Sequence, residues 1–280
     1  MLIDTHAHLT DPRFAGDLDA VLRRAGEAGV GAILDVGDSA ASSASCVGHA
    51  RSCAGVFAAV GIHPNNAAEA EPGDLDRIAE LALDGRVAAL GETGLDYYRR
   101  RSPREAQERI FRGTLDLALG TGLPVVMHCR DAYAALIGVL GEARYAGIRG
   151  VVHCFSGTGN DAEAIVGLGH SLSVGGPLTY PSNAGLRDTV RAAPIGRILV
   201  ETDCPYLPPE GERGKRNEPA LVARVADDLA RLRGVSPGEI ARITTENALR
   251  LFTRMGAAVR TGDTLISKVA RSPFRPFTGS

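Results

Sequence analysis

Lysine, paired cysteines and long apolar runs are all scarce in this chain of 280 residues. Lys215 and Lys268 are its only lysines, so no reaction can use a lysine elsewhere in the sequence. Its five cysteines include no CxxC pair, and with no signal peptide ahead of Leu2 they indicate reduced thiols in a cytoplasmic protein. No apolar run reaches the roughly 18 residues that a membrane span requires, so we expect no membrane partner.

The charges of the chain are nearly balanced. The formal net charge is −2 and 44% of the residues are hydrophobic, which are ordinary values for a globular protein. Without an overall positive field, any nucleic-acid binding has to be local. Nothing in the composition indicates an obligate protein partner.

Eight short apolar runs alternate with amphipathic segments. Such runs can be buried on both faces, which is typical of a parallel sheet. Eight of them indicate an α/β fold of the (β/α)₈ or TIM-barrel type, and no glycine-rich dinucleotide fingerprint supports an open sheet. The predicted strands are 2–6, 32–36, 56–62, 87–91, 124–129, 150–154, 171–175 and 198–202. The predicted helices include 17–28, 39–53, 73–83, 103–121, 219–233 and 237–255.

The barrel is predicted to occupy residues 1–256 as a single domain, because no linker interrupts the alternation. From residue 257 to residue 280 the pattern gives way to Gly, Thr, Ser and Pro. We therefore expect a mobile C-terminal tail over 257–280, of no readable function.

The first apolar run ends in His6 and His8. Residues two apart on a strand point to the same side, so both imidazoles can be directed at one point. Paired imidazoles suit zinc, manganese or iron. The pair alone is equally compatible with two histidines that only make hydrogen bonds at a strand end.

Metal-binding residue types recur at the ends of the other runs. Reacting groups of such barrels lie at the carboxyl ends of the strands. All but two of the seven histidines fall there; the exceptions, His49 and His170, are expected to be structural or on the surface. His63 follows the third run. The candidate metal ligands are His6, His8, Glu92, His128, His153 and Asp203.

Four imidazoles and two carboxylates are too many for one tetrahedral ion with an open position. They fit two divalent ions (Mg, Mn or Zn, with the identity left open) that share a carboxylate. Glu92 is the natural bridge. One ion would be held by His6, His8 and Asp203, because the first and last strands of a closed barrel are neighbours. The other ion would be held by His128 and His153. We expect Asp203 and Glu92 to be the catalytic residues, with Asp203 as the general base.

Four further residues lie close to these ligands in the sequence. Cys129, Cys154 and Cys204 each follow a ligand directly, so strand alternation points them towards the helices as small buried hydrophobes. Glu201 lies two residues before Asp203 and faces inward. It is either a group that fixes a ligand or a buried carboxylate without such a role.

The same segments resemble TatD-type metal-dependent deoxyribonucleases of the amidohydrolase superfamily. The similarity runs from residue 2 to about 255, and the tail has no counterpart. It implies a metal-dependent hydrolase that cleaves DNA phosphodiesters, with ligands at the six positions named above. The segments that carry it are 4–9, 61–64, 91–97, 128–130, 153–157, 201–205 and 216–219.

Local charge indicates how the substrate would be held. Arginines follow tyrosines in 97–101, and a second basic loop covers 213–216. Aromatic rings beside arginines can stack bases and hold phosphates, although a solvated charge run remains an alternative. What the resemblance to TatD-type enzymes implies is exonuclease action on single-stranded DNA or DNA ends. The predicted substrate contacts are His63, which a structural role would explain equally well, and Arg99, Arg130, Arg216 and Asn217.

Two other functions stay open at this point. A small-ester or lactone hydrolase could use the same barrel with a glutamate bridge. Relatives bridged by a carboxylated lysine are excluded, because Lys215 and Lys268 lie far from the fourth run. A non-catalytic binding protein would have no need to keep all six ligands.

Overall fold

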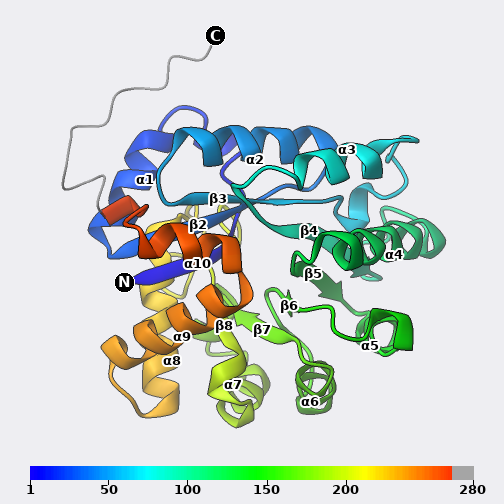
Figure 1. The fold of residues 1–280 in the computed structure, drawn as a ribbon. Helices are drawn as coiled ribbons and strands as arrows, with labels where there is room; N and C mark the ends of the chain where they lie inside the picture. Colours follow the sequence, from blue (N-terminus) through cyan, green and yellow to red (C-terminus); the bar gives the residue numbers. More distant parts are fainter. Residues whose placement is uncertain (267–280) are drawn as a thin grey trace.

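The fold is a closed barrel of eight parallel strands that follow the chain in order (Figure 1). The computed structural model describes residues 1–266. Closure joins the first strand to the segment after the last: the Asp203 amide donates to the His6 carbonyl at 2.9 Å and the His8 amide to the Cys204 carbonyl at 2.8 Å. The predicted TIM barrel is therefore confirmed. Its strands are β1 (Leu2–Ala7), β2 (Val30–Val36), β3 (Val56–Val60), β4 (Val87–Asp96), β5 (Val125–Arg130), β6 (Gly150–Val152), β7 (Ser171–Val174) and β8 (Ile198–Val200).

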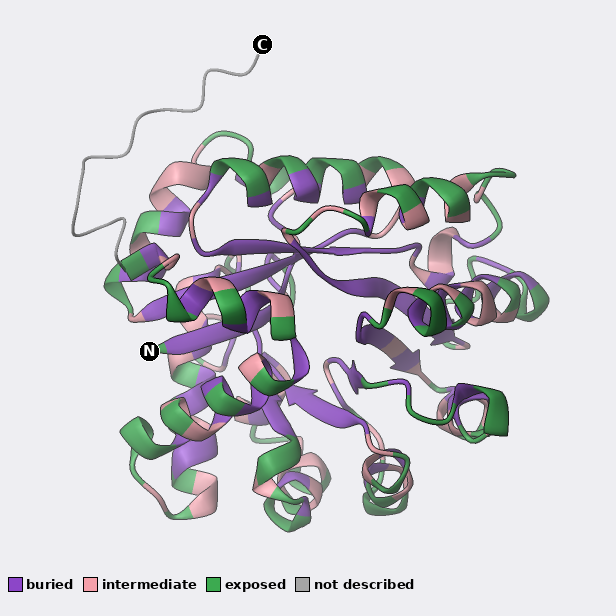
Figure 2. Ribbon diagram, in the orientation of Figure 1, coloured by how far each residue is buried: buried purple, intermediate pink, exposed green. Residues whose placement is uncertain are grey.

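Helices surround the strands and expose one face each, whereas the strands are buried almost throughout (Figure 2). None of the helices within residues 1–266 has the length and apolar character needed to cross a bilayer. The helices are α1 (Leu18–Glu27), α2 (Ala40–Ser52), α3 (Asp74–Leu81), α4 (Arg104–Thr121), α5 (Tyr133–Leu140), α6 (Gly159–Gly167), α7 (Ala184–Ala192), α8 (Val222–Arg233), α9 (Pro237–Leu251) and α10 (Thr253–Arg260).

Neighbouring residues of each strand belong to two different cores. Ile33 packs in the outer core between strands and helices, while Leu34 packs in the inner core of the barrel. The inner core also takes in Phe252 and Met255, next to the α9–α10 junction. The strand alternation therefore lines much of the barrel interior with apolar side chains, and the polar side chains of Thr5 and Ser173 pair with each other there.

The C-terminal part of the barrel extends further than we predicted. The predicted helix 237–255 is divided at Phe252, and α10 crosses the predicted boundary at residue 256. Leu265 is only 1% exposed, and Asp263 accepts a hydrogen bond from the Gly55 amide at 2.9 Å. The packed chain thus includes part of the predicted tail. Its remainder, 267–280, lies outside the described residues.

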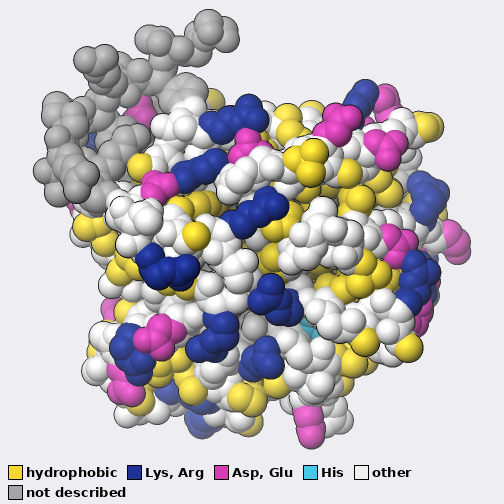
Figure 3. Space-filling view, in the orientation of Figure 1, with side chains coloured by type: hydrophobic (Ala, Val, Ile, Leu, Met, Phe, Trp, Pro, Cys, Tyr) yellow, Lys and Arg dark blue, Asp and Glu magenta, His cyan; other side chains and the backbone are white. Residues whose placement is uncertain are grey.

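The end of the barrel covered by α10 has a structural role. Figure 3 shows basic side chains distributed over this face. The α10 residue Arg254 donates to the carbonyls of Ala82, Asp84 and Val87, each at 2.9 Å, at the start of β4. These contacts satisfy carbonyl groups at the amino-terminal ends of the strands. The carboxyl ends, at the opposite side, remain for chemistry.

β4 runs five residues beyond the predicted end, and two glycines allow it. Gly91 (φ +121°) and Gly94 (φ +133°) adopt backbone conformations that side chains disfavour. A Cβ at Gly91 would overlap the Val126 carbonyl oxygen, and one at Gly94 would overlap that of His128. β4 and β5 can therefore approach closely on both sides of Glu92.

We predict that Gly94→Ala lowers the free energy of unfolding by roughly 1–3 kcal/mol, because the new methyl group meets backbone rather than a movable side chain. Gly120→Ala is the matched control: it lies in α4 with nothing within 4 Å of the added Cβ. There we expect no loss, or a gain of up to about 1 kcal/mol. Chemical denaturation measures both, and equal stabilities of the two variants would contradict the prediction.

His170 makes stability depend on pH. It is 2% exposed at the entry of β7, as expected for a structural histidine, and burial followed by the nearby charge of Arg197 lowers its pKa from 6.5 to about 4. As the pH falls below 6.5, His170 becomes protonated in the unfolded chain but stays neutral in the folded chain. Stability attributable to this residue is therefore lost between about pH 6.5 and pH 4.

We predict that His170→Leu shows a smaller loss of unfolding free energy on acidification than the wild type. The expected difference is about 2 kcal/mol near pH 5, from the separation of the two pKa values. Denaturant titrations at neutral pH and near pH 5 give the four free energies. Parallel losses in both proteins would count against this assignment.

Candidate metal centre

Three ligand candidates meet where the barrel closes. His6 is buried at the end of β1, His8 follows it, and their Nε2 atoms lie 3.2 Å apart. Asp203 follows β8 with φ +58°, and its Oδ1 lies 3.5 Å from His8 Nε2 and 3.8 Å from His6 Nε2. The structure thus brings these three side chains together, as the sequence predicted.

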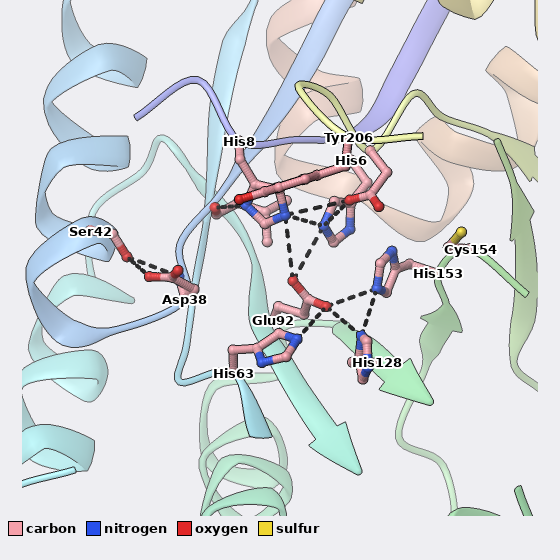
Figure 4. Close-up of polar contacts among 12 residues, drawn as sticks. His6, His8, Asp38, Ser42, His63, Glu92, His128, His153, Cys154 and Tyr206 are labelled. Atoms are coloured by element: carbon pink, nitrogen blue, oxygen red, sulfur yellow. Dashed lines mark hydrogen bonds and ion pairs between the residues drawn. The ribbon is translucent and has the colours of Figure 1, made fainter. Parts of the chain in front are cut away.

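His128 and His153 form the second half of the cluster. His128 lies on β5 and His153 directly follows β6. His128 Nδ1 is 3.3 Å from His153 Nε2, and both nitrogens face Glu92 Oε1, at 2.9 and 2.8 Å. Figure 4 shows these two rings directed at the Glu92 carboxylate; the His153 ring also stacks on the His6 ring, with the ring centres 3.9 Å apart.

Glu92 stands between the two groups and is 2% exposed. Its Oε1 faces His128 and His153, while its Oε2 lies 3.4 Å from His6 Nε2 and 3.7 Å from His8 Nε2. Each oxygen therefore belongs to a different histidine pair. A carboxylate that joins two cations needs this division of its oxygens.

The donor set suits bound cations on a second ground. The buried nitrogens His6 Nδ1 and His153 Nδ1 make no hydrogen bond within residues 1–266, and the Nε2 atoms of the same rings are the ones that face Glu92. His6, His153 and Glu201 form a further group whose ligand atoms all lie within 4.8 Å of one another. Imidazole and carboxylate donors together match zinc, manganese and related divalent ions.

The two carboxylates remain charged despite their burial. Burial opposes ionisation of Glu92, but the favourable interaction with the histidines around it, His153 first among them, outweighs burial, so its pKa lies well below the ordinary value. Burial likewise opposes ionisation of Asp203, yet the hydrogen bond from His8 and the neighbouring histidine charges lower its pKa. Any cation that binds here has to displace protons from the ring nitrogens, so its affinity should fall in acid.

The backbone and a carboxylate orient two of the ligands from behind. His8 Nδ1 lies 2.9 Å from the Val36 carbonyl, which can only accept, so this nitrogen donates and Nε2 is left to face the centre. His128 Nε2 lies 3.2 Å from Asp96 Oδ2. The contact of Asp96 with His128 was not predicted from the sequence. Its position four residues after Glu92 was visible, but we expected β4 to end at residue 91.

Two further buried aspartates, also missed, hold the segments that carry the ligands. Asp4 accepts hydrogen bonds from the Thr202 amide at 2.9 Å and the Thr202 hydroxyl at 2.6 Å, which ties β1 to the Asp203 segment. Asp35 on β2 accepts from the Leu9 amide at 2.8 Å and pairs with His49 at 2.8 Å. Asp4 lies two residues before His6, so the same alternation rule could have indicated it.

Glu201 contacts a ligand, which decides between the two roles left open for it. Its Oε1 accepts from the Cys154 amide at 2.7 Å and lies 3.4 Å from His153 Nδ1. Glu201 therefore fixes the position of His153 from inside the barrel.

The cysteine predictions hold for two of the three positions. All five cysteines are free thiols, and Cys129 and Cys204 pack in the outer core. Cys154 does not: it is half-buried, and its φ of +43° reverses the chain after β6, so strand alternation no longer applies. Burial and the charges of Asp203, Glu201 and Glu92 raise the pKa of its thiol well above the ordinary value, which keeps it protonated.

His63 lies inside the cluster rather than at its margin. Its Nδ1 accepts from the Asn65 amide at 2.9 Å, so Nε2 carries the proton, and Nε2 is 3.4 Å from Glu92 Oε1. Burial lowers the pKa of His63 to about 4, which leaves the ring neutral at physiological pH. A neutral donor beside Glu92 can hydrogen-bond either a ligand or the carboxylate.

Arg99 and Arg130 lie at the rim beside this cluster. The Arg99 amide donates to Asp96 Oδ1 at 2.7 Å, and the Arg130 guanidinium lies 3.9 Å from the centre of the Tyr98 ring. Neither guanidinium forms an ion pair with a carboxylate of residues 1–266. Tyr98 itself is 60% exposed. Both arginines are therefore available to an anion.

Arg216 and Asn217, which we predicted to contact substrate, both form hydrogen bonds within the protein. Arg216 binds both carboxylate oxygens of Asp17, at 2.8 and 2.7 Å. Asn217 is buried, and its side-chain nitrogen donates to the carbonyls of Thr202 at 2.8 Å and Tyr206 at 2.7 Å. These contacts fix the loop that carries Asp203. The polar atoms of both residues are used within the protein, and their contact with substrate stays a prediction.

Comparison with known proteins agrees with this centre. Residues 3–253 match the family model of the TatD related DNases. The chain is 39% identical over 252 residues to an uncharacterised metal-dependent hydrolase, YabD, of Bacillus subtilis, with 90% of this chain and 99% of that protein covered. It is 35% identical over 259 residues to a protein of Pantoea vagans named 3'-5' ssDNA/RNA exonuclease TatD, with 90% and 99% covered.

A solved structure supports the same assignment. The crystal structure of YjjV, a TatD homologue from Escherichia coli, superposes with a TM-score of 0.86 at 35% identity and covers 90% of this chain and 98% of its own. The resemblance inferred from the motifs is thereby confirmed, and the chain belongs to the TatD related DNase family.

Proposed function

We propose that this protein is a metal-dependent DNA phosphodiesterase, an exonuclease that acts on single-stranded DNA or DNA ends with two divalent ions. The observation that carries the proposal is the division of the Glu92 oxygens between two histidine pairs. The name of the Pantoea vagans relative, a 3'-5' ssDNA/RNA exonuclease, supports the choice of substrate.

Two groups of residues would hold the ions. His6, His8 and Asp203 would hold one, His128 and His153 the other, and Glu92 both. When bound, such ions supply Lewis acidity, which makes water a stronger nucleophile at neutral pH and stabilises charge on phosphoryl oxygens. Magnesium, manganese and zinc are all compatible with these donors.

Asp203 would accept the proton of the attacking water. It is ionised, because its pKa is lowered, and the hydrogen bond with His8 holds its carboxylate in place. A carboxylate in hydrogen-bond reach of a water is the geometry that a general base requires. Glu92 maintains the negative charge between the two histidine pairs, and Glu201 keeps His153 in position.

Four side chains would contact the DNA. The protonated Nε2 of His63 can donate to a phosphate oxygen, and Arg99 and Arg130 carry unpaired guanidinium groups at the rim. Tyr98, stacked on Arg130, offers an exposed ring to a base.

The cytoplasmic location inferred from the cysteines stays a prediction.

We predict that zinc or manganese raises the melting temperature of the wild type and that Glu92→Gln largely abolishes this shift. The amide cannot supply two anionic oxygens, so neither histidine pair keeps its full affinity. A ligand at about 100 times its dissociation constant stabilises by about 2.7 kcal/mol. Asp38→Asn is the matched control: this carboxylate lies near the same rim, outside the ligand cluster, and accepts from the Ser42 hydroxyl at 2.7 Å (Figure 4).

The control should retain the full metal-induced shift. Metal analysis after dialysis supplies the stoichiometry, for which we expect two ions per chain. One ion per chain in the wild type, or equal shifts in Glu92→Gln and the wild type, would refute the proposed bridge.

We predict that Asp203→Asn and His128→Ala each lower the turnover of a single-stranded oligonucleotide by about 100-fold or more, since each removes a general base or a ligand. Circular dichroism should show an intact barrel in both. A lactone panel and single-stranded RNA, assayed beside the DNA, test the other substrates of such a barrel. Faster turnover of a lactone than of DNA by the wild type would overturn the proposed function.

A further inference from the structure

A basic cavity, the arginine pocket, lies beside the metal centre. It has a volume of about 550 Å³, and its lining includes Asp96, Tyr97, Arg100, Arg101, Arg104 and Gln107. We propose that the arginine pocket binds a second phosphate of the nucleic-acid strand, at a distance from the phosphate under attack. This inference rests on the proposed function and adds a subsite to it.

The charges of the three pocket arginines are not compensated by carboxylates in the described part of the chain. Arg100, Arg101 and Arg104 are exposed and form no ion pair with a carboxylate of residues 1–266. Further along α4, by contrast, Arg112 is bound by Glu108 at 2.9 Å and by Glu142 at 2.6 Å. Uncompensated arginines around one cavity create a local positive potential.

The walls of the pocket are fixed in advance by buried polar contacts. Gln107, buried in α4, donates to the carbonyls of Asp96 at 3.1 Å and Ser102 at 2.9 Å, and accepts from the Asp96 amide at 2.7 Å. It thus clamps both ends of the loop that carries Arg100 and Arg101. A loop held in this way loses little conformational freedom when a ligand binds.

Two of the arginines are also oriented. The Arg104 guanidinium lies 4.0 Å from the centre of the Tyr97 ring, and Arg100 Nε donates to the Tyr97 carbonyl at 3.2 Å. Stacking leaves the edge of a guanidinium group free to donate in its own plane. Planar donors of this kind match phosphate oxygens in a two-point contact.

Asp96 connects the pocket to the metal centre. Its Oδ2 lies 3.2 Å from His128 Nε2, while its Oδ1 accepts from the amides of Tyr98 at 3.0 Å and Arg99 at 2.7 Å. The negative charge of the pocket's own carboxylate is therefore already engaged by donors. A nucleic-acid strand that leaves the metal centre over this loop meets Tyr98 and then the arginine pocket. A polyanion can therefore bind the pocket, whereas a small neutral ester gains no affinity from it.

The test is a binding measurement in the presence of a chelator, which prevents hydrolysis. Fluorescence anisotropy with a short labelled single-stranded DNA compares the wild type with the triple variant Arg100→Ala, Arg101→Ala and Arg104→Ala. Loss of one charge-assisted phosphate contact should weaken binding about 10-fold or more. The slope of log affinity against log salt should become shallower by about 0.7.

Arg109→Ala is the matched control. Arg109 is exposed on the same helix, is not among the pocket residues, and carries the same charge. It should bind DNA like the wild type. The single variant Arg101→Glu, a smaller change at an exposed position, should also weaken binding, and melting curves verify that both pocket variants are folded.

A set of oligonucleotides with one neutral methylphosphonate linkage each locates the contact. In the wild type one linkage remote from the cleaved bond should be more sensitive than its neighbours, and the triple variant should lose that sensitivity. Equal binding of wild type and triple variant, or the same profile along the strand in both, would overturn the arginine pocket. Pocket-dependent binding without hydrolysis in magnesium, manganese or zinc would instead refute the proposed function and leave the pocket standing.

Discussion

The centre depends on one buried negative charge. Glu92 is almost inaccessible to solvent, and a carboxylate in that position is tolerable only when several positive or donor groups surround it. His6, His128 and His153 supply that compensation from three different strands or strand ends. Glu201 lies behind His153 and Asp96 lies behind His128, so two of these histidines are supported in turn by further carboxylates. The residues at the carboxyl ends of the strands provide the environment that this carboxylate requires.

The sequence alone predicted the barrel and the proximity of the six candidate ligands, because two simple rules apply to both, but it did not predict that His63 lies among them. Strand alternation directs His6 and His8 to one side, and parallel strands bring their carboxyl ends to a common rim. The groups behind the ligands were harder to predict. Asp96 depends on how far β4 continues, which two glycines with positive φ decide. Cys154 was misplaced for a related reason: the chain turns immediately after β6, and alternation holds only inside a strand.

Arg216 and Asn217 illustrate a different limit. Residue type and position near the rim are the same for a group that binds substrate and for one that supports a loop. Only the partners distinguish them, and those partners, such as Asp17 for Arg216, are far away in the sequence. The same comparison separates the arginines of the molecule into two kinds. Arg254 donates hydrogen bonds to carbonyl groups at the start of β4. The arginines of the arginine pocket, by contrast, form no ion pair with a carboxylate of residues 1–266.

The way the barrel closes has a consequence for how the protein is made. His6 and His8 leave the ribosome long before Asp203 and the Cys204 carbonyl that meets the His8 amide, which follow only after the last strand. A nascent chain that has not yet reached β8 therefore presents two histidines without their carboxylate partner. The group of His6, His8 and Asp203 can therefore assemble only after β8 has been made, and a chain truncated before residue 203 lacks it together with the outer-core residues of α8 and α9.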